Sequence, residues 1–478
     1  MEKSSVVRFA ILGITLTAIT SLYANQNALS FTIICMEDVI HSKSTNETEG
    51  DHWLNNSNKR NVLFSIIAIG QLLGNSSYRS SNTNNRIKVY LPNLRSLSDI
   101  TTLANPLAVE LGHLYLTIVR FLQGFALAII IVSCGQVATQ WSPHNESATF
   151  IAILSCNIQL GLAVTIPLAT MLCQSLGWRS LYYFFGIFGI LSTAAFFFMF
   201  RDDPRKHWMV SDKELKAITA GKEGPTVREP VPYTKICSDP CMHASLLLAI
   251  GGFAGLLVIS VYGPTFINKA LGIQLTNTGL LTALPHALAM VLKLLVGPLF
   301  DISTFISEKN RLIILVFLTQ GITAFCLFVI SQKPSEVLTQ VAYCGASACI
   351  GLAGVSVLKI AQMVTQQHVD FVLVCITFCG CATAMILPAI VAIVCPNNTV
   401  DEWSTLLLGT SVFIAISIVP FMFVARDKPA TCARTSTEAS QPCYLATESK
   451  AKIVPSATVR TESDLQSSVK MTQVASES

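Results

Sequence analysis

Long apolar runs recur along the chain, and they constrain its fold more than any other feature of the sequence. Eleven runs lie at 9–36, 61–74, 114–138, 148–173, 181–200, 243–267, 279–300, 311–330, 337–364, 371–394 and 403–425. As helices, which rise about 1.5 Å per residue, they cross or nearly cross the ~30 Å hydrocarbon core of a bilayer. Charged residues make up only 13% of the chain, about half the share in soluble domains. The sequence therefore predicts an all-α polytopic membrane protein.

The same composition argues against other classes of protein. So little charge cannot cover the surface of a cytosolic enzyme of 478 residues, and a net charge of +4 does not suggest nucleic-acid binding. Most of the 15 Cys lie inside apolar runs as small core residues, while Cys237 and Cys241 lack the spacing of a zinc pair. The sequence also has no nucleophile elbow and no phosphate-binding Gly-rich loop. We expect no catalytic site, no metal and no cofactor.

The first run, Phe9–Met36, has two interpretations. Arg8 and the apolar stretch after it suit a secretory signal peptide. Leu22, however, is a poor residue two positions before a cleavage site, and the apolar pattern resumes from Ala28 to Cys35. These features favour an uncleaved first span.

A twelfth span is expected within 87–109, although this segment is unusually polar. Arg95 and Asp99 would be costly against lipid. Because they are four residues apart, they share one helix face and can pair there. The segment therefore suits a helix buried among other helices.

The distribution of positive charge agrees with twelve spans and two cytoplasmic termini. In that topology 22 of the 32 Lys and Arg residues lie on the cytoplasmic side, 6 lie in outer loops and 4 lie inside spans. Without the 87–109 span, the basic central loop would lie outside, against the positive-inside rule.

Glycosylation sequons fit the same topology. Asn46, Asn55 and Asn397 begin sequons in the first and last outer loops. Asn75 and Asn145 also match the sequon but fall in cytoplasmic loops, so we expect them to be unmodified.

The chain divides into four predicted parts. Residues 1–200 hold six spans, 201–240 form a charged cytoplasmic central loop, 241–425 hold six more spans, and 426–478 form a Ser- and Thr-rich tail that we expect to be disordered. Within the central loop, Ser211 and Glu214 have the spacing of a capping box and predict a short helix.

Motifs spread over 110–425 carry a resemblance to a known family. They are Val119–Gly124, Trp141–Pro143, Gly161 with Pro167–Ala169, Gly177–Ser180, Asp203–His207, Ser211–Glu214, Leu284–His286, Gly297–Asp301 and Glu402–Trp403. In this order they resemble the anion:cation symporter family of the major facilitator superfamily, which holds sodium–phosphate cotransporters, sialic acid exporters and vesicular glutamate transporters. The resemblance implies the major facilitator fold, with 12 transmembrane helices in two six-helix halves.

The sequence departs from this family where glutamate carriers have functional side chains. Gln26 stands at the position of a first-span arginine, Leu127 at that of a fourth-span glutamate, and Gly252 near that of a seventh-span arginine. Gln159 stands at the position of a fifth-span tyrosine. The resemblance therefore carries over the fold but not glutamate as the substrate.

Polar residues inside spans are the candidate substrate-binding residues. Arg120 must face the bundle interior or a wet cavity, where it either braces two helices or contacts an anion. Lys293 lies too deep in its span to reach the headgroups easily, which favours a cavity-facing charge, whereas Lys359 can snorkel. Gln26, Asn157 and Gln159 are polar positions in spans that line the cavity in this fold.

Four further residues are candidates for coupling or gating. His286 is either a packing histidine or a proton-coupling group. Asp301 is expected in a gating loop that stabilises one conformation. Arg95 and Asp99 are either a structural pair or part of the coupling machinery.

We therefore expect a secondary active transporter of a small organic or inorganic anion that works by alternating access. Sodium or protons are the possible coupling ions, and the plasma membrane or an intracellular vesicle membrane is the expected location. The alternative is a non-transporting sensor or scaffold on a transporter fold, which the lost Arg and Glu positions favour. A heptahelical receptor does not fit the number of spans.

Overall fold

A computed structural model of the chain describes residues 6–36, 53–80, 87–143, 146–219, 233–270, 272, 283–295, 306–365 and 369–424. Every regular element in these ranges is a helix, and eight of the described helices are long and apolar enough to cross a membrane. Each of the eleven apolar runs contains a helix. The prediction of an all-α membrane protein is therefore confirmed.

The first group of helices comes from residues 6–199. It comprises α1 (Val6–Cys35), α3 (Ser57–Ser80), α4 (Ile87–Leu111), α5 (His113–Leu127) followed by α6 (Ile129–Trp141), α7 (Ser147–Leu154) followed by α8 (Asn157–Ser175), and α9 (Arg179–Met199). The predicted first span is thus one continuous helix. Two apolar clusters, built mainly from these helices, form the core of this group.

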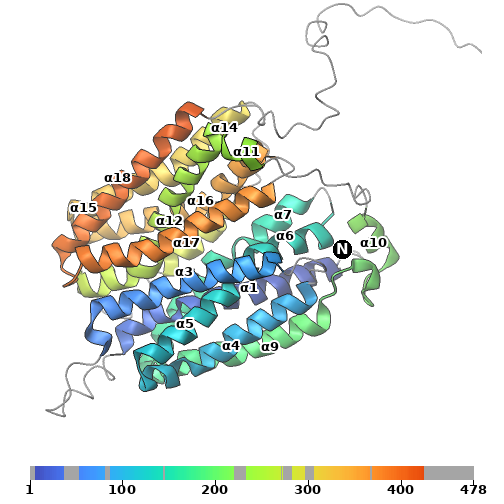
Figure 1. The fold of residues 1–478 in the computed structure, drawn as a ribbon, viewed down its shortest axis with the longest axis horizontal. Coiled ribbons are helices and arrows are strands. Elements are labelled where there is room, and N and C mark those ends of the chain that lie inside the picture. Colours follow the sequence, from blue (N-terminus) through green and yellow to red (C-terminus); the bar gives the residue numbers. More distant parts are fainter. Residues whose placement is uncertain are drawn as a thin grey trace, which may run out of the picture. The chain divides into compact units, whose positions relative to one another are not determined.

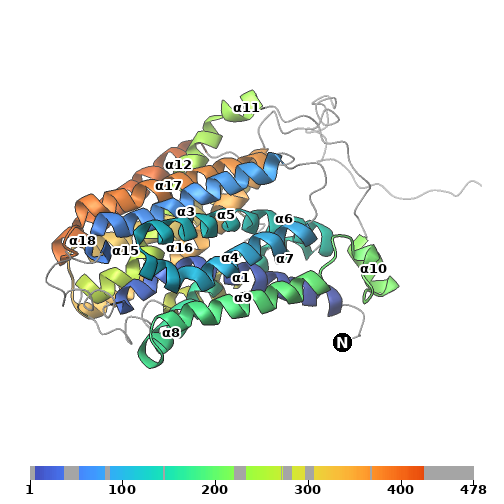
Figure 2. The same cartoon turned by 60° about the horizontal axis from the view of Figure 1, so that its bottom comes forward.

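The second group of helices comes from residues 240–424. It comprises α12 (Pro240–Thr265) with the π-helical turn η4 (Phe266–Ala270), a helix at Ala283–Leu295, α14 (Glu308–Val316), η5 (Phe317–Gly321) and α15 (Ile322–Ser331), α16 (Glu336–Thr365), α17 (Val369–Val394) and α18 (Val400–Val424). Figures 1 and 2 show this group beside the first, with α3 next to α17.

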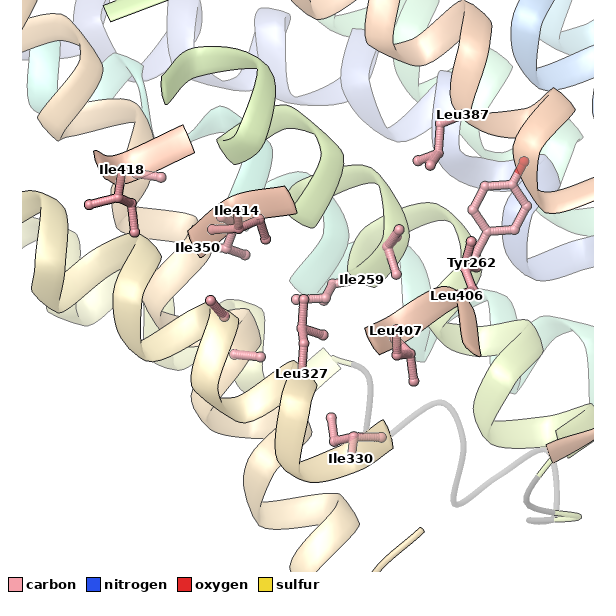
Figure 3. Packing of buried hydrophobic residues seen from close by; sticks show 14 of the residues in the cluster. Ile259, Tyr262, Leu327, Ile330, Ile350, Leu387, Leu406, Leu407, Ile414 and Ile418 are labelled. Carbon is pink, nitrogen blue, oxygen red and sulfur yellow. The ribbon is translucent and has the colours of Figure 1, made fainter. Parts of the chain in front are cut away.

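A large apolar cluster forms the core of the second group. Ile259, Leu327, Ile350 and Ile414 interlock between α12, α15, α16 and α18 (Figure 3). Tyr262 and Leu387 belong to the same cluster and lie at one edge of the view (Figure 3). Both groups of helices belong to one compact unit, residues 1–433. This unit does not test the boundaries expected at residues 200, 240 and 425, which stay a prediction.

Large apolar side chains cover the outer face of the bundle. On α9, for example, Phe188 is 42% exposed, Leu191 64% and Phe198 71%. Soluble monomers rarely expose a continuous apolar face of this extent to water. In a bilayer the same face contacts lipid tails. The exposed face therefore agrees with a position inside a bilayer.

The polar segment 87–109 forms the buried helix that the sequence predicts. α4 packs between α5 and α9, and Arg95, Asp99 and Thr102 lie on one stripe of it with 0% exposure. Because this stripe faces other helices, its polar groups find partners there instead of lipid. The Nε atom of Arg95 lies 3.8 Å from an oxygen of Asp99, so the predicted pairing is confirmed.

Glycines bring α3 and α5 into backbone contact. Gly70 and Gly74 of α3 are four residues apart and face α5, while Gly124 of α5 faces the backbone of Ile67. Small residues at this spacing let membrane helices approach closely, which increases van der Waals contact where no hydrophobic driving force exists. α3 and α5 therefore form one tightly packed pair.

The central loop contains the predicted short helix. α10 (Asp212–Thr219) begins after Ser211, whose hydroxyl accepts a hydrogen bond from the amide of Glu214 at 3.3 Å. The carboxylate of Glu214 instead accepts from the backbone amide of Arg8 at 2.9 Å, and so caps the first turn of α1. The short elements η1 (Trp53–Asn55), η3 (Pro204–Lys206) and α11 (Tyr233–Cys237) complete the described helices.

Candidate functional site

A pocket lies between the two groups of helices. Helices α1, α3 and α5 line it on one side, and α12 and α17 line it on the other. Its lining residues are Gln26, Asn27, Ser30, Phe64, Ile67, Ala68, Gln71, Arg120, Leu257, Val261, Tyr262, Ala384, Leu387 and Pro388. The pocket is small: its volume of about 40 Å³ has room for about three water molecules.

Arg120 supplies the charge of this pocket. Arg120 is 1% exposed, and its Nη1 donates to Oε1 of Gln123 at 2.8 Å. Its buried Nε has no hydrogen-bond partner among the described residues. Among the residues that the structure describes, no carboxylate lies within salt-bridge distance of the guanidinium. The result is a buried cation whose charge no described acid balances.

A second hydrogen bond holds the partner of Arg120 in place. Nε2 of Gln123 donates to Oγ1 of Thr102 on α4 at 3.0 Å, and the Thr102 hydroxyl donates to the carbonyl of Ser98 at 2.7 Å. Because Gln123 uses its oxygen for Arg120 and its nitrogen for Thr102, both ends of its amide are occupied. The guanidinium is therefore oriented by α4 as well as by α5.

α1 contributes three neutral polar groups to the pocket. Gln26 is half-buried, while Asn27 and Ser30 are 5% and 6% exposed. Gln26 and Ser30 are four residues apart and so lie one turn apart on the same face. Amide and hydroxyl groups of this kind can both donate and accept, so they suit the oxygen atoms of an anion.

Apolar and aromatic groups close the pocket from the second group of helices. Tyr262, which is 5% exposed, donates its hydroxyl to Oδ1 of Asn61 on α3 at 3.2 Å. Nearby, the Ser65 hydroxyl donates to the carbonyl of Met385 on α17 at 3.0 Å. These two bonds join the two groups of helices beside the pocket.

The structure places three predicted substrate-binding residues outside this pocket. Lys293 is 4% exposed and donates to the carbonyl of Ser155, at the interruption between α7 and α8, at 2.7 Å. Gln159 donates to the carbonyl of Gly351 on α16 at 3.0 Å. Asn157 is 2% exposed at the start of α8. Only Gln26 and Arg120 come together, and the substrate-binding role of all five stays a prediction.

The predicted coupling and gating residues lie in different places. His286 is 3% exposed, and within the described part of the chain its buried Nε2 has no hydrogen-bond partner. Arg95 and Asp99 form the buried ion pair of α4. Asp301 lies outside the described residues. No observation tests the coupling or gating role of these four residues.

The glycosylation predictions also stay untested. Asn397 is exposed between α17 and α18, where its amide bonds to the carboxylate of Glu402 at 3.1 Å. Asn55 ends η1, and Asn46 lies outside the described residues.

Sequence reasoning missed most of the pocket. Asn27 and Ser30 follow Gln26 on α1, and the four-residue spacing of Gln26 and Ser30 is a sequence signal that they share one helix face. Gln71 is a polar residue inside an apolar run, which offers a second signal. The sequence contains no signal for Tyr262 and Leu387. Apolar residues of a membrane span show the same sequence pattern whether they face lipid, the protein core or a cavity.

The arrangement can bind an anion, but it offers no group for covalent chemistry. The pocket has one cation, several hydrogen-bonding groups and an apolar side, which is the usual composition of a small-molecule site. Within the described ranges, no group of three His, Cys, Asp or Glu residues lies close enough to hold a metal ion. The polar groups of the pocket therefore have the chemistry to contact a small anion.

Comparison with known proteins agrees with the fold. The family model of the Major Facilitator Superfamily matches residues 97–370. Rabbit (Oryctolagus cuniculus) sodium-dependent phosphate transport protein 1 is 22% identical over 430 residues, which are 85% of this chain and 90% of that protein. A mouse (Mus musculus) protein named "Probable small intestine urate exporter" is 28% identical over 207 residues, 43% of this chain and 42% of that protein.

A solved structure shows the same fold. The crystal structure of the D-xylose–proton symporter matches with a TM-score of 0.65 and 14% sequence identity, and the match covers 89% of this chain and 99% of the symporter. At this identity the likeness concerns the fold alone.

Proposed function

The chain belongs to the Major Facilitator Superfamily, and on this premise we propose that it is a secondary transporter of a small organic or inorganic anion that works by alternating access. The membership confirms the predicted fold class and the multi-pass membrane location. The proposal adds the charge of the substrate and the manner of transport. The membrane concerned is the plasma membrane or that of an intracellular vesicle.

The buried cation in the pocket carries this proposal. A guanidinium without a carboxylate partner is expensive in a low-dielectric interior. A bound anion offsets that cost, because its charge and its oxygen atoms replace the water that Arg120 lacks. The free Nε and the planar fork of an arginine suit a bidentate contact with a phosphate or carboxylate group. A cationic or neutral sugar substrate would leave the charge unbalanced.

The names of related proteins narrow the class of substrate and of coupling ion. The rabbit relative is named for sodium-dependent phosphate transport and the mouse relative for urate export, and both solutes are anions. The structural neighbour is a proton symporter. We therefore propose a sodium or proton gradient as the driving force, with inorganic phosphate and urate as the first solutes to test.

Uptake into proteoliposomes tests the proposal. Purified protein is reconstituted, and uptake of radiolabelled phosphate, and separately of radiolabelled urate, is followed with an inward sodium gradient, a proton gradient or neither. We expect at least one anion to accumulate above protein-free vesicles under one of the gradients. Arg120→Lys should lose most of this uptake, because lysine keeps the charge but lacks the planar fork.

Arg179→Lys is the matched control. Arg179 is about half exposed and pairs with Glu110 at 3.0 Å, and exposed pairs of this kind contribute about 1 kcal/mol or less. Its uptake should equal that of the parent. Equal uptake by the Arg120→Lys variant would contradict the assignment of Arg120. Saturable anion binding without flux under any gradient would instead indicate the sensor or scaffold.

A further inference from the structure

The buried ion pair of α4 holds α1 at two points. Oδ1 of Asp99 accepts a hydrogen bond from Nδ2 of Asn25 at 3.1 Å, and Nη1 of Arg95 donates to the carbonyl of Ala18. Asn25, Arg95 and Asp99 all have 0% exposure. Each member of the pair thus binds a different turn of the same helix.

The pair is anchored on its other side by α9. The Thr193 hydroxyl donates to Oδ2 of Asp99 at 2.9 Å, and Nη2 of Arg95 donates to the carbonyl of Gly189 at 3.3 Å. A side chain at residue 189 would overlap the Asp99 carboxylate, so the glycine provides the space for it. The ion pair is therefore a fixed point between α9 and α1.

Helix geometry connects this fixed point to the pocket. Ala18 and Asn25 are seven residues apart, which places them on one face of α1. At about 100° per residue, Gln26 and Ser30 lie about 100° and 140° around the helix from Asn25. The face that α4 contacts and the face that lines the pocket thus lie roughly 100–140° apart on one helix. A rotation of α1 that moves one face moves the other.

A chain of hydrogen bonds also connects α4 to Arg120 in the pocket. Thr102 lies one turn beyond Asp99 and accepts from Gln123, which in turn accepts from Arg120. The same polar stripe of α4 therefore contacts both the helix that carries Gln26 and the side chain that orients Arg120.

From this geometry we infer that the Arg95–Asp99 pair, acting through Asn25, positions the substrate-binding face of α1. Asn25 and Asp99 are positioning residues, because they do not line the pocket but set the rotation of the helix that does. The pair is neutral as a whole, so it fixes α1 without adding net charge beside Arg120. The inference rests on the proposed function only in that the positioned face binds the transported anion.

The main test replaces Asn25 and compares it with a control on the other side of the pair. Asn25→Ala removes the bond from α1 to Asp99. Thr193→Val removes from α9 the hydroxyl that donates to the same carboxylate and accepts from Nε of Arg95, but no contact of α1. Phosphate and urate uptake is measured over a range of concentrations and corrected for the amount of folded protein. We expect Asn25→Ala to raise the KM about tenfold, as the loss of a hydrogen bond to a charged group suggests, with Vmax little changed. Thr193→Val leaves the contact between Asn25 and Asp99 in place, so its KM should stay closer to that of the parent than the KM of Asn25→Ala.

A reciprocal exchange tests whether the bond itself matters. Asn25→Asp alone places two carboxylates together, and Asp99→Asn alone leaves Arg95 without its partner. The double variant Asn25→Asp with Asp99→Asn restores one amide and one carboxylate at the same two positions. Its KM should be closer to that of the parent than the KM of either single variant. Double and single variants with the same KM would overturn the inference.

Hydrogen exchange supplies a readout that needs no substrate. Backbone amides of α1 around residues 22–30 should exchange faster in Asn25→Ala than in Thr193→Val, because only the first variant frees α1. Equal exchange in the two variants would overturn the inference even if transport is observed. If neither anion is transported, the proposed function fails for those solutes, and the exchange data still decide the role of Asn25.

Discussion

Gly124→Ala is the substitution whose cost follows most directly from the structure. A Cβ atom at residue 124 would lie 2.7 Å from Cα of Ile67 and 2.8 Å from its carbonyl carbon. Non-bonded carbon atoms settle at about 3.5–4.0 Å, so α3 and α5 would have to separate by about 1 Å. The atoms that clash belong to the backbone of α3 and cannot rotate away, as the end of a side chain can.

The expected cost follows from two opposing terms. Overpacking of this kind costs about 1–3 kcal/mol, and a clash with backbone places it at the upper end. Replacement of a helical glycine by alanine returns about 1 kcal/mol. We therefore expect Gly124→Ala to destabilise the protein by about 2 kcal/mol. Because Ile67 and Arg120 lie on the same pair of helices, the pocket should widen as well.

Gly135→Ala is the matched control for this prediction. Gly135 also lies in a helix, α6, but a Cβ there would meet no atom within 4 Å. It should keep only the helix-propensity gain, so its stability should equal or exceed that of the parent. Thermal stability of the detergent-solubilised variants, followed by the recovery of monodisperse protein after heating, measures both. A Gly124→Ala protein as stable as Gly135→Ala would refute the proposed backbone contact.

Three further comparisons, each between two variants, test contacts and topology. Arg95→Ala should lower the folded yield, because breaking a buried pair costs about 3–5 kcal/mol, and Arg95→Ala with Asp99→Ala should partly restore it; equal losses would show that the two residues do not interact. Lys293→Gln, which keeps a donor for the Ser155 carbonyl, should give more folded protein than Lys293→Met by about 1 kcal/mol of stability, and equal yields would exclude that bond. Asn397→Gln should abolish one glycosidase mobility shift in an expressing cell and Asn145→Gln none, whereas a shift lost on Asn145→Gln would place that loop outside.

The sequence predicts the pairing on α4 because the signal is local. Arg95 and Asp99 are four residues apart, and helix geometry alone brings such residues together. Their polar character also indicates that the segment is buried among helices. The helices that hold its hydrogen-bond partners, α1 and α9, are remote in sequence, so the bonds from Asn25 and Thr193 could not be predicted.

The pocket residues, too, could be predicted from the sequence only in part. Gln26 and Arg120 are polar groups inside apolar runs, and this signal identified them as candidates. Tyr262 and Leu387 enter the pocket only because α12 and α17 pack against α1 and α3, which no local pattern encodes. Lys293 is an intermediate case, since its burial was predictable but its partner is a backbone carbonyl at a helix interruption.

The capping box predicted at Ser211 and Glu214 forms only in part. The spacing of Ser211 and Glu214 predicted a capping box, and the Ser211 half of it is present. The carboxylate of Glu214, however, meets the first turn of α1, whose positive dipole end and free backbone amides attract it. The carboxylate thus accepts from a donor of another helix, the Arg8 amide, and this bond joins the segment between the two groups of helices to α1.

The unbalanced charge of Arg120 has an electrical consequence for a transport cycle. A monovalent anion beside the guanidinium cancels its charge, so, apart from the charge of the coupling cation, the loaded pocket responds little to the membrane voltage. The empty pocket keeps one positive charge, and a unit charge that crosses the full potential changes in energy by about 2.3 kcal/mol per 100 mV. The return of the empty carrier would then be the voltage-sensitive step. With a divalent anion such as doubly ionised phosphate, the loaded pocket carries one negative charge, and the voltage acts on both steps with opposite sign.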